Sequence, residues 1–241
     1  MIRKKAVLLI FAGTVGSGKT THINLLFKHL KRKAYKVKKT QLKSNCLLAY
    51  YTLNVIGRIL GVKSSRNYLI RDLFESNPHL LKRIGQMWLL LDFFSVLIVS
   101  LVRVIIPLKL GYIVLCEDFL PATVTDYYFF AKNLRIVPLG LVRRLSRLLL
   151  FMIPNNSAII FLDANNSLLK QRWKHRRTRA ELEEYISAQR EIIALQKILF
   201  ERKVQLFQIN TGVNDIMTTA EYVKKYFKLM LTRRSRSARK C

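Results

Sequence analysis

The chain has 241 residues, of which 51% are hydrophobic, and its 43 lysines and arginines against 14 aspartates and glutamates give a formal net charge of +29. This length suits one α/β domain, and the hydrophobic content excludes a globally disordered chain. So large a positive charge attracts nucleotides, nucleic acid and anionic lipid alike, although a generally basic surface without a specific partner accounts for it equally well.

Two apolar segments resemble targeting or membrane signals. Residues 1–12 have a basic start, but their apolar stretch is short and runs into a glycine-rich loop, which favours a strand over a signal peptide. Residues 87–108 approach the length of a membrane helix, but Asp92 and Arg103 lie inside them, and each would cost about 2.5–3.5 kcal/mol at a bilayer centre. We expect a buried helix and no integral membrane segment, with the membrane alternative open because basic residues surround this segment.

The three cysteines, Cys46, Cys116 and Cys241, lack the C-x-x-C spacing of a zinc site and form no disulfide framework by number or position. They indicate a reducing compartment, and we expect a cytoplasmic protein.

Apolar runs and helical periodicities alternate along the chain. The predicted strands are 6–12, 35–40, 112–118, 158–163 and 204–210, and the predicted helices are 20–33, 46–60, 79–106, 122–132, 138–152, 165–200 and 214–231. This alternation predicts an α/β fold, a three-layer α/β/α sandwich with a parallel central sheet. Residues 1–231 are expected to form one domain. Residues 232–241 are expected to be a basic disordered tail, either a solvated end or a contact for nucleic acid or membrane.

A phosphate-loop motif follows the first predicted strand. The pattern G-x-x-x-x-G-K-[ST] is matched by Gly13, Thr14, Val15, Gly16, Ser17, Gly18, Lys19 and Thr20, and with Thr21 these are the predicted ATP-binding residues. Glycines let the backbone amides converge on phosphate, and the following helix points its N-terminus at the anion. Lys19 supplies a cation for the β- and γ-phosphate oxygens, and Thr20 a hydroxyl for Mg²⁺.

Phosphoryl transfer also needs an acidic group near the metal and positive charge around the moving phosphoryl. Glu117 and Asp118 end one buried strand and are predicted to contact Mg²⁺ or orient the acceptor, whereas Asp163 is expected to cap the next helix. In residues 170–179, Arg172, Arg176 and Arg179 have helical spacing, so a catalytic arginine on a shared face is one reading. The other reading is a solvated basic face.

The phosphate loop, the strand "GYIVLCEDFL", the segment "FLDANNSLLKQRWKHRR" and the segment "INTGVNDIMTTAEYVKKYF" follow one another in the order and spacing seen in thymidylate kinases. Over most of residues 5–230 the chain resembles this family of P-loop nucleoside-monophosphate kinases. The resemblance implies the three-layer α/β/α P-loop NTPase fold, with residues 1–231 as one P-loop kinase-like domain whose parallel sheet is flanked by helices. It also implies transfer of the γ-phosphoryl of ATP to dTMP with Mg²⁺.

By this resemblance Glu117 replaces the aspartate of the family's Asp-Arg-Tyr/Phe motif and Phe119 its aromatic residue, while Trp88 stacks on the acceptor base. Arg172, Arg176 and Arg177 match the arginines of the lid that closes over ATP. The chain departs from the family on the acceptor side. Asp118 replaces an arginine, the phosphate loop lacks an acidic residue, and Asp92 and Phe93 lie near the place of a base-reading arginine.

Two functions follow from these observations. The first is an ATP- and Mg²⁺-dependent nucleoside-monophosphate kinase with catalytic Lys19, Glu117, Arg172 and Arg176 and metal-binding Thr20, Glu117 and Asp118. The second is a catalytically altered ATP-binding protein that docks on nucleic acid or an anionic membrane surface through its basic residues. A replacement cation at the acceptor pocket, such as Arg66, Arg71 or Arg83, would favour the enzyme. The segment "TQLKSN" only loosely resembles the family's Arg-Glu-Pro segment, and Lys43 is its nearest cation. A homodimer is a further expected partner.

Overall fold

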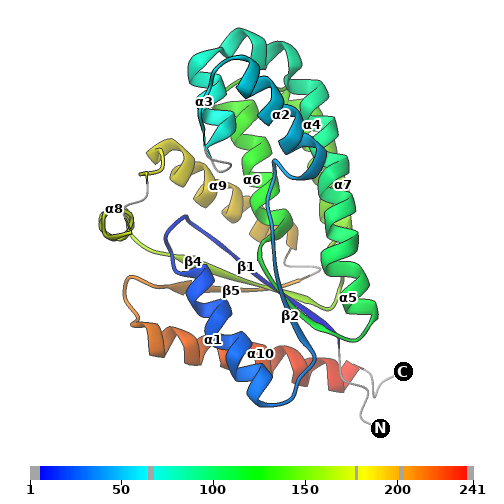
Figure 1. Cartoon of the computed structure of the whole chain (residues 1–241). Helices are drawn as coiled ribbons and strands as arrows, with labels where there is room; N and C mark the ends of the chain where they lie inside the picture. The colour runs from blue at the N-terminus through cyan, green and yellow to red at the C-terminus, as the bar shows by residue number, and fades with distance from the viewer. Residues whose placement is uncertain (1–5, 65–67, 177–178, 201–203, 238–241) are drawn as a thin grey trace.

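The computed structural model describes residues 6–64, 68–176, 179–200 and 204–237. Five parallel strands form one sheet in the order β2-β3-β1-β4-β5. Helices cover both faces of the sheet (Figure 1), so the predicted three-layer α/β fold is confirmed. The strands are β1 (Val7–Gly13), β2 (Val37–Leu42), β3 (Ile113–Asp118), β4 (Ser157–Asp163) and β5 (Gln205–Asn210). The helices are α1 (Lys19–Arg32), α2 (Leu47–Ile59), α3 (Leu69–Ser76), α4 (Pro78–Ser100), a π-helical turn (Leu101–Ile105), α5 (Ile106–Lys109), α6 (Phe119–Lys132), α7 (Leu139–Phe151), α8 (Asn166–His175), α9 (Glu183–Phe200) and α10 (Ile216–Ser237).

Strand β1 lies at the centre and is buried along its whole length. Its alternate side chains point to opposite faces, as the pleat requires. Val7, Leu9 and Phe11 pack with α1 and α10, whereas Leu8 and Ile10 join the larger core under α4, α6 and α7. Because both faces are covered, β1 reads as a continuous apolar run. The carboxyl ends of β1 and β3 carry the phosphate loop and the Glu117–Asp118 pair.

The long apolar helix is longer than predicted. Helix α4, the π-helical turn and α5 follow one another without a break from Pro78 to Lys109. Pro107 cannot donate a backbone N–H to the preceding turn, and the wider π-helical turn before it accommodates this loss. Within the part of the chain that the structure describes, this is the one helical run long and apolar enough to cross a membrane by length and composition.

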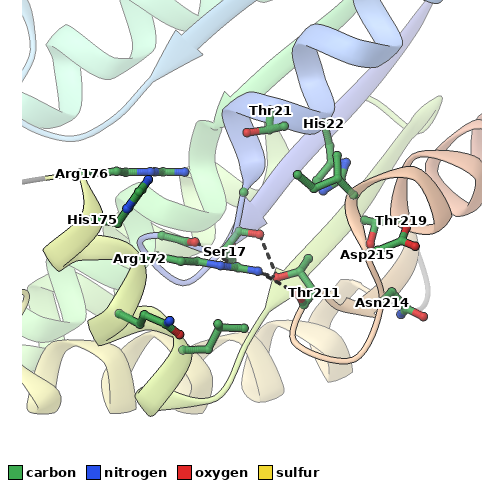
Figure 2. A pocket seen from close by; sticks show the side chains of 15 residues that line it. Ser17, Thr21, His22, Arg172, His175, Arg176, Thr211, Asn214, Asp215 and Thr219 are labelled. Atoms are coloured by element: carbon green, nitrogen blue, oxygen red, sulfur yellow. Dashed lines mark hydrogen bonds between the residues drawn. The ribbon is translucent and has the colours of Figure 1, made fainter.

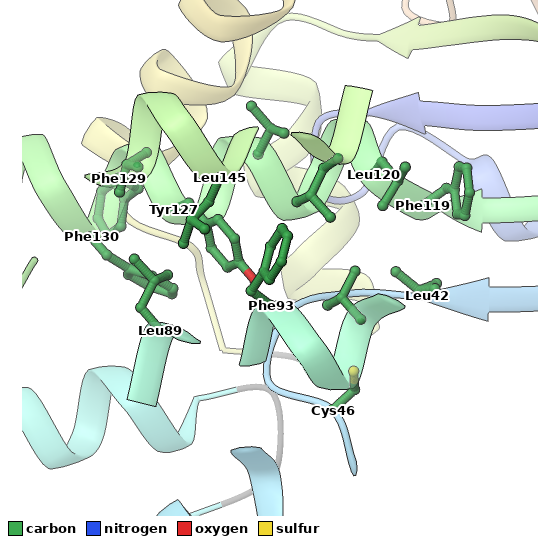
Figure 3. Close-up of a cluster of buried hydrophobic side chains, with 14 of the residues drawn as sticks. Leu42, Cys46, Leu89, Phe93, Phe119, Leu120, Tyr127, Phe129, Phe130 and Leu145 are labelled. Carbon is green, nitrogen blue, oxygen red and sulfur yellow. The ribbon is translucent and has the colours of Figure 1, made fainter. Parts of the chain in front are cut away.

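Asp92 lies on the inward face of α4 and is fully buried. Its carboxylate accepts hydrogen bonds from the Tyr127 hydroxyl at 3.0 Å and from the Cys46 backbone N–H at 3.2 Å. Phe93 and Tyr127 belong to the same buried cluster (Figure 3). Burial raises the pKa of Asp92 to about 7, and its two hydrogen bonds oppose that rise. The residue that argued against a membrane span at the sequence level is therefore a polar anchor between α4, α6 and the start of α2.

We expect Asp92→Asn to weaken the pH dependence of stability. The folded-state pKa of Asp92 is about 7 and its ordinary value is 3.8, so this group stabilises the fold at acid pH and loses that contribution as pH rises through about 7. Asparagine keeps the acceptor oxygen and cannot ionise. Between pH 4 and 8, the free energy of unfolding measured by urea titration should fall less in the variant than in the parent chain.

Asp215→Asn is a matched control. Hydrogen bonds from Thr218 and from the Met217 amide lower the pKa of Asp215, so its contribution to the free energy of unfolding changes with pH only below its ordinary value of 3.8. Parallel stability curves for the parent chain and Asp92→Asn would show that Asp92 is ionised in the folded state at all these pH values.

Two further helix boundaries differ from the prediction. The single helix expected over 165–200 is two helices, because α8 ends at His175 and α9 begins at Glu183. The last helix, expected over 214–231, is α10 and continues to Ser237. Of the expected tail, residues 238–241 lie outside the described residues. Local periodicity did not reveal either of these helix ends.

Candidate active site

The loop over residues 13–20 joins β1 to α1 and presses closely against its neighbours. At Gly13, with φ +141°, an added Cβ would lie 1.9 Å from the carbonyl oxygen of Leu162. At Gly16, with φ +90°, it would lie 2.7 Å from Nε1 of Trp173. Both positions therefore need glycine for backbone conformation and for space. The loop is held between β4 and α8 rather than projecting into solvent.

The N-terminus of α1 is open to an anion. Gly18 is its N-cap residue and contributes no side-chain cap, and the first turn contains no acidic residue. The first backbone N–H groups of a helix lack intrahelical acceptors and bind phosphate well. The Ser17 hydroxyl is buried beside them and has no hydrogen-bond partner in the described part of the chain. A buried polar atom without a partner next to a helix N-terminus fits a phosphate-bearing ligand.

Lys19 is 8% exposed and folds back over the loop. Its ammonium donates to the carbonyl oxygens of Gly13 at 2.9 Å and Thr14 at 3.0 Å, and it lies 3.5 Å from an Asp118 carboxylate oxygen. This places the predicted phosphate-binding cation in the loop itself. It also gives Lys19 a carboxylate partner that a nucleotide phosphate would have to replace.

Thr20 and Glu117 lie together, as the sequence predicted. The Thr20 hydroxyl donates to the Glu117 carboxylate at 2.7 Å, across 97 residues of sequence. The structure contains no cluster of three or more His, Cys, Asp or Glu side chains for a metal within its described residues. A hydroxyl and a carboxylate nevertheless fit Mg²⁺, which takes oxygen ligands and completes its octahedron with water and substrate phosphates.

Asp118, which we predicted to bind the metal, is buried and lies between two lysines. Its carboxylate lies 3.5 Å from the Lys19 ammonium and 3.4 Å from that of Lys43, and it accepts a hydrogen bond from Gln41. Burial alone would raise the pKa of Asp118, but Lys19 and Lys43 outweigh it and the pKa is lowered. Asp118 in turn raises the pKa of Lys43. Both groups are therefore charged at neutral pH, and Asp118 orients two lysines.

A cavity of about 400 Å³ opens beside the loop. It is lined by the start of α1, by α8 and by the segment between β5 and α10 (Figure 2). Arg172 crosses its floor and donates to the Gly16 carbonyl at 3.2 Å, and to the hydroxyl and carbonyl of Thr211 at 3.0 and 2.9 Å. Burial and Arg176 lower the pKa of Arg172. Arg172 thus connects α8 to the phosphate loop, which adds a positioning role to the predicted catalytic one.

Arg176 lines the same cavity with an exposed side chain, and Arg177 lies outside the described residues. The expectation that Arg179 shares their helical face is wrong, because α8 ends at His175. Arg179 instead pairs with Asp72 at 2.7 Å and lies over the ring of Tyr68. It therefore ties this segment to α3, away from the cavity.

The remaining predicted loop residues have defined partners. The Thr14 hydroxyl donates to Asp163 at 2.9 Å, and the Val15 amide donates to Gln189 at 3.3 Å. Thr21 lines the cavity. The role expected for Asp163 is wrong: Asn165 caps α8 by accepting from the Leu168 amide at 2.9 Å.

Asp163 instead pairs with Arg190 at 3.0 Å while it accepts from Thr14. The phosphate loop is thereby fastened to α9 through a carboxylate that sequence reasoning assigned elsewhere.

The acceptor side differs most from expectation. Trp88 is 2% exposed and packs edge to face on Phe130, with ring centroids 5.5 Å apart, so it is a core residue and cannot stack on a base. Among the candidate replacement cations, Arg71 pairs with Glu75 at 2.8 Å, Arg83 is exposed on α4, and Arg66 lies outside the described residues. Lys43, which was not among these candidates, reaches Asp118 at 3.4 Å. Asp118 also contacts Lys19 of the phosphate loop, so Lys43 is the cation that the structure places next to this loop.

Sequence reasoning missed two groups of polar residues. Thr211, Asn214, Asp215 and Thr219 line the cavity from the segment after β5. Their signal was present in the polar run that follows the last predicted strand, since ligands bind at the carboxyl ends of parallel strands. The second group surrounds Asp126, which is buried and accepts hydrogen bonds from the Ser44 and Tyr185 hydroxyls, both at 2.5 Å. Burial raises the pKa of Asp126.

No known family model matches the sequence, and no curated protein matches it either. Solved structures do match. A thymidylate kinase from Candida albicans superposes with a TM-score of 0.62 at 14% identity, covering 93% of this chain and 92% of that one. A thymidylate kinase from Ehrlichia chaffeensis superposes with a TM-score of 0.55 at 18% identity, covering 93% of this chain and 98% of that one. The chain therefore has a thymidylate-kinase-like fold over nearly its whole length.

Proposed function

We propose that the protein is an ATP- and Mg²⁺-dependent phosphotransferase that moves the γ-phosphoryl group to a nucleoside monophosphate, dTMP or another nucleotide. The observation that carries the proposal is the convergence at one loop of Lys19, the Thr20–Glu117 pair and the open cavity. Phosphoryl transfer needs positioned charge more than covalent chemistry, and these groups provide it. The likeness to two thymidylate kinases supports the same class of reaction.

Each group has a role in this reaction. The base of ATP occupies the cavity beside Arg172 and Thr211, with its phosphates along the loop and the N-terminus of α1. Lys19 exchanges Asp118 for the β- and γ-phosphate oxygens, and Arg176 adds positive charge from α8. Thr20 and Glu117 would hold Mg²⁺, and the bound ion would neutralise charge that develops on the phosphates.

The acceptor oxygen attacks the γ-phosphorus in line as the bond to the β,γ-bridging oxygen breaks, and ADP leaves. On the acceptor side Lys43 is the cation for an acceptor phosphate, held in place by Asp118 at 3.4 Å. A cytoplasmic location supplies the ATP and fits the buried cysteines Cys46 and Cys116.

The test is ADP release measured with a panel of nucleoside monophosphates and nucleosides, with Mg²⁺ and after its removal by EDTA. We expect turnover with one monophosphate, lost in EDTA and lowered about 10- to 100-fold by Glu117→Gln, a loss typical of a disturbed metal site. The matched control is Glu221→Gln, a carboxylate on α10 whose partner is Lys224. ATP binding without turnover for any acceptor would instead indicate an ATP-dependent binding protein.

A further inference from the structure

Helices α1 and α10 lie side by side on the face of the sheet opposite α4 and α6 (Figure 1). Their inward side chains share one apolar core with the central strands. Their outward side chains, with those in and just before the neighbouring strand β2, carry a dense set of positive charges. We call this surface the basic face; it consists of Lys28, Lys31, Arg32, Lys33, Lys36, Lys39, Lys224, Lys225 and Lys228. All of them except the half-buried Lys224 are exposed.

Aromatic rings hold the lysines on the β2 side of α1. The ammonium groups of Lys31 and Lys39 lie 5.8 and 6.0 Å from the centroid of the same ring, that of Phe27. The Lys36 ammonium lies 5.6 Å from the ring centroid of Tyr112. A cation over an aromatic face is attracted to it, so these lysines stay close together despite their like charge. Residues of α1 and of the β2 region therefore form one positive surface.

The pKa of His29 on α1 reflects charges from both helices. Burial lowers this pKa most, and Lys33 of α1 and Lys224 and Lys228 of α10 lower it further. Among the groups that act on His29, Glu221 alone raises the pKa, and its carboxylate is paired with Lys224 at 2.6 Å. Charges act together on one imidazole only when they lie near it. The basic face is therefore continuous across the contact between α1 and α10.

A stack of three aromatic rings borders the basic face on α10. Phe207 of β5 stacks on Tyr226, with ring centroids 4.2 Å apart and an interplanar angle of 14°. Tyr226 stacks on Tyr222, with centroids 6.5 Å apart and an angle of 21°. Tyr222 ends the stack and is 40% exposed, and Lys225 follows it by three residues, on the same side of the helix. An exposed ring next to a lysine suits a planar base that is attached to a phosphate.

The make-up of this surface favours one class of partner. A second copy of the chain, with 43 basic and 14 acidic side chains, would repel it. A lipid surface is bound best by apolar side chains that insert, and among the described residues of α1 and β2 no large apolar side chain is exposed. Single-stranded nucleic acid offers closely spaced phosphates to the lysines and unpaired bases to Tyr222. A duplex offers the phosphates but keeps its bases stacked inside.

We propose that the basic face binds single-stranded nucleic acid, with the backbone phosphates on its lysines and a base stacked on Tyr222. RNA and single-stranded DNA share the phosphates and the free bases, and the experiment separates the two. This function goes beyond the phosphotransfer reaction and does not depend on it. No residue of the basic face lines the cavity beside the phosphate loop, so a strand and a nucleotide can be held together.

The experiment is fluorescence anisotropy of labelled oligothymidylate and oligouridylate of about 12 nucleotides, with the full chain and saturating ATP. We expect binding that weakens from about 50 to about 200 mM salt. Lys225→Gln/Lys228→Gln should weaken binding and lower the slope of log K against log salt by about 1.4, since each single-strand phosphate contact contributes about 0.7. The matched control is Lys82→Gln/Lys109→Gln, two exposed lysines on α4 and α5 whose loss should leave the slope unchanged.

The stacked base has its own test. Tyr222→Ala should weaken binding of the single strands about fivefold or more, the lower end of the effect of losing one stacked base, and should leave the salt slope unchanged. Tyr222→Phe keeps the ring and should keep the affinity. Duplex DNA of the same length should bind more weakly and should not respond to Tyr222→Ala. The tighter of the two oligonucleotides identifies the strand as RNA or DNA.

ATP binding and thermal unfolding verify that every variant folds. Equal losses for Lys225→Gln/Lys228→Gln and for the control pair would overturn the proposal, since the general positive charge would then hold the strand. An affinity that Tyr222→Ala leaves unchanged would overturn it too, as would displacement of the strand by polyglutamate as readily as by unlabelled strand. Anionic vesicles that bind through Lys225 and Lys228 while the oligonucleotides do not bind would assign the face to lipid instead. Losses confined to the basic-face pair and Tyr222→Ala support the proposal.

Discussion

Lys19→Met should lower acceptor-dependent ADP release by about 10²–10³-fold, the loss typical of removing one charge-stabilising group from a transition state. Lys19 is buried in the loop, within 3.0 Å of two loop carbonyl oxygens, so no neighbouring cation can take its place without rebuilding the loop. The fold should survive, because Asp118 keeps Lys43 and Gln41 as partners. Steady-state kinetics with the accepted nucleotide measure the first effect, and circular dichroism verifies the second.

Lys28→Met is the control on the same helix, since Lys28 is exposed on α1 and lies away from the loop. It removes the same charge and should leave the rate unchanged. If both variants lost activity equally, the general positive field of the protein would be responsible. If neither did, the loop would not hold the reacting phosphates and the proposed reaction would be wrong.

Gly13→Ala should lower the free energy of unfolding by about 3–5 kcal/mol, through a close contact and an unfavourable φ together. The added Cβ would lie 1.9 Å from the Leu162 carbonyl oxygen, and that carbonyl also accepts the Thr14 amide at 3.2 Å. Strand β4 cannot retreat without breaking this bond and its pairing with β1. Chemical denaturation, followed by tryptophan fluorescence, measures the change.

Two other glycines separate the causes. Gly61 also has a positive φ, +72°, but an added Cβ meets nothing within 4 Å, so Gly61→Ala should cost only the backbone strain, about 1–2 kcal/mol. Gly140 lies in α7 without a positive φ and with open space, so Gly140→Ala should be neutral or stabilise by up to about 1 kcal/mol. A loss at Gly13 no larger than that at Gly61 would show that β4 yields to the new side chain.

The fold and the phosphate loop were predictable because their signals are local. A strand that is buried on both faces has a continuous run of apolar residues, as residues 7–12 show. The glycine pattern predicts the backbone conformation of the phosphate loop residue by residue. The pairing of Thr20 with Glu117 followed from one topological fact, that parallel strands bring their carboxyl ends to one edge of the sheet. Each of these inferences needed no knowledge of packing.

The wrong predictions about single side chains concern which neighbour each side chain meets. Helical spacing placed Trp88 on the long helix. It did not show that Trp88 lies on the buried face of this helix, where its ring packs against Phe130. An aspartate at a strand end is a good helix cap by residue type. Asn165, however, lies two residues closer to α8 and caps it, so that Asp163 pairs with Arg190 instead. Arg179 was grouped with its helical neighbours because a helix end between 175 and 183 left no mark in the charge pattern.

The hydrogen bonds that close the cavity beside the phosphate loop also affect when, during synthesis and folding, the protein becomes able to bind nucleotide. The Thr211 hydroxyl donates to the Ser17 carbonyl across 194 residues, and Arg172 donates both to Thr211 and to the Gly16 carbonyl. Contacts so distant in sequence form late, since a long loop must close before they contribute. During synthesis the phosphate loop is made early, but its cavity waits until the ribosome has released β5 and the start of α10. Nucleotide binding therefore requires the whole domain to be folded. A chain that ends before residue 211 would contain the phosphate-loop motif but would lack the cavity beside it.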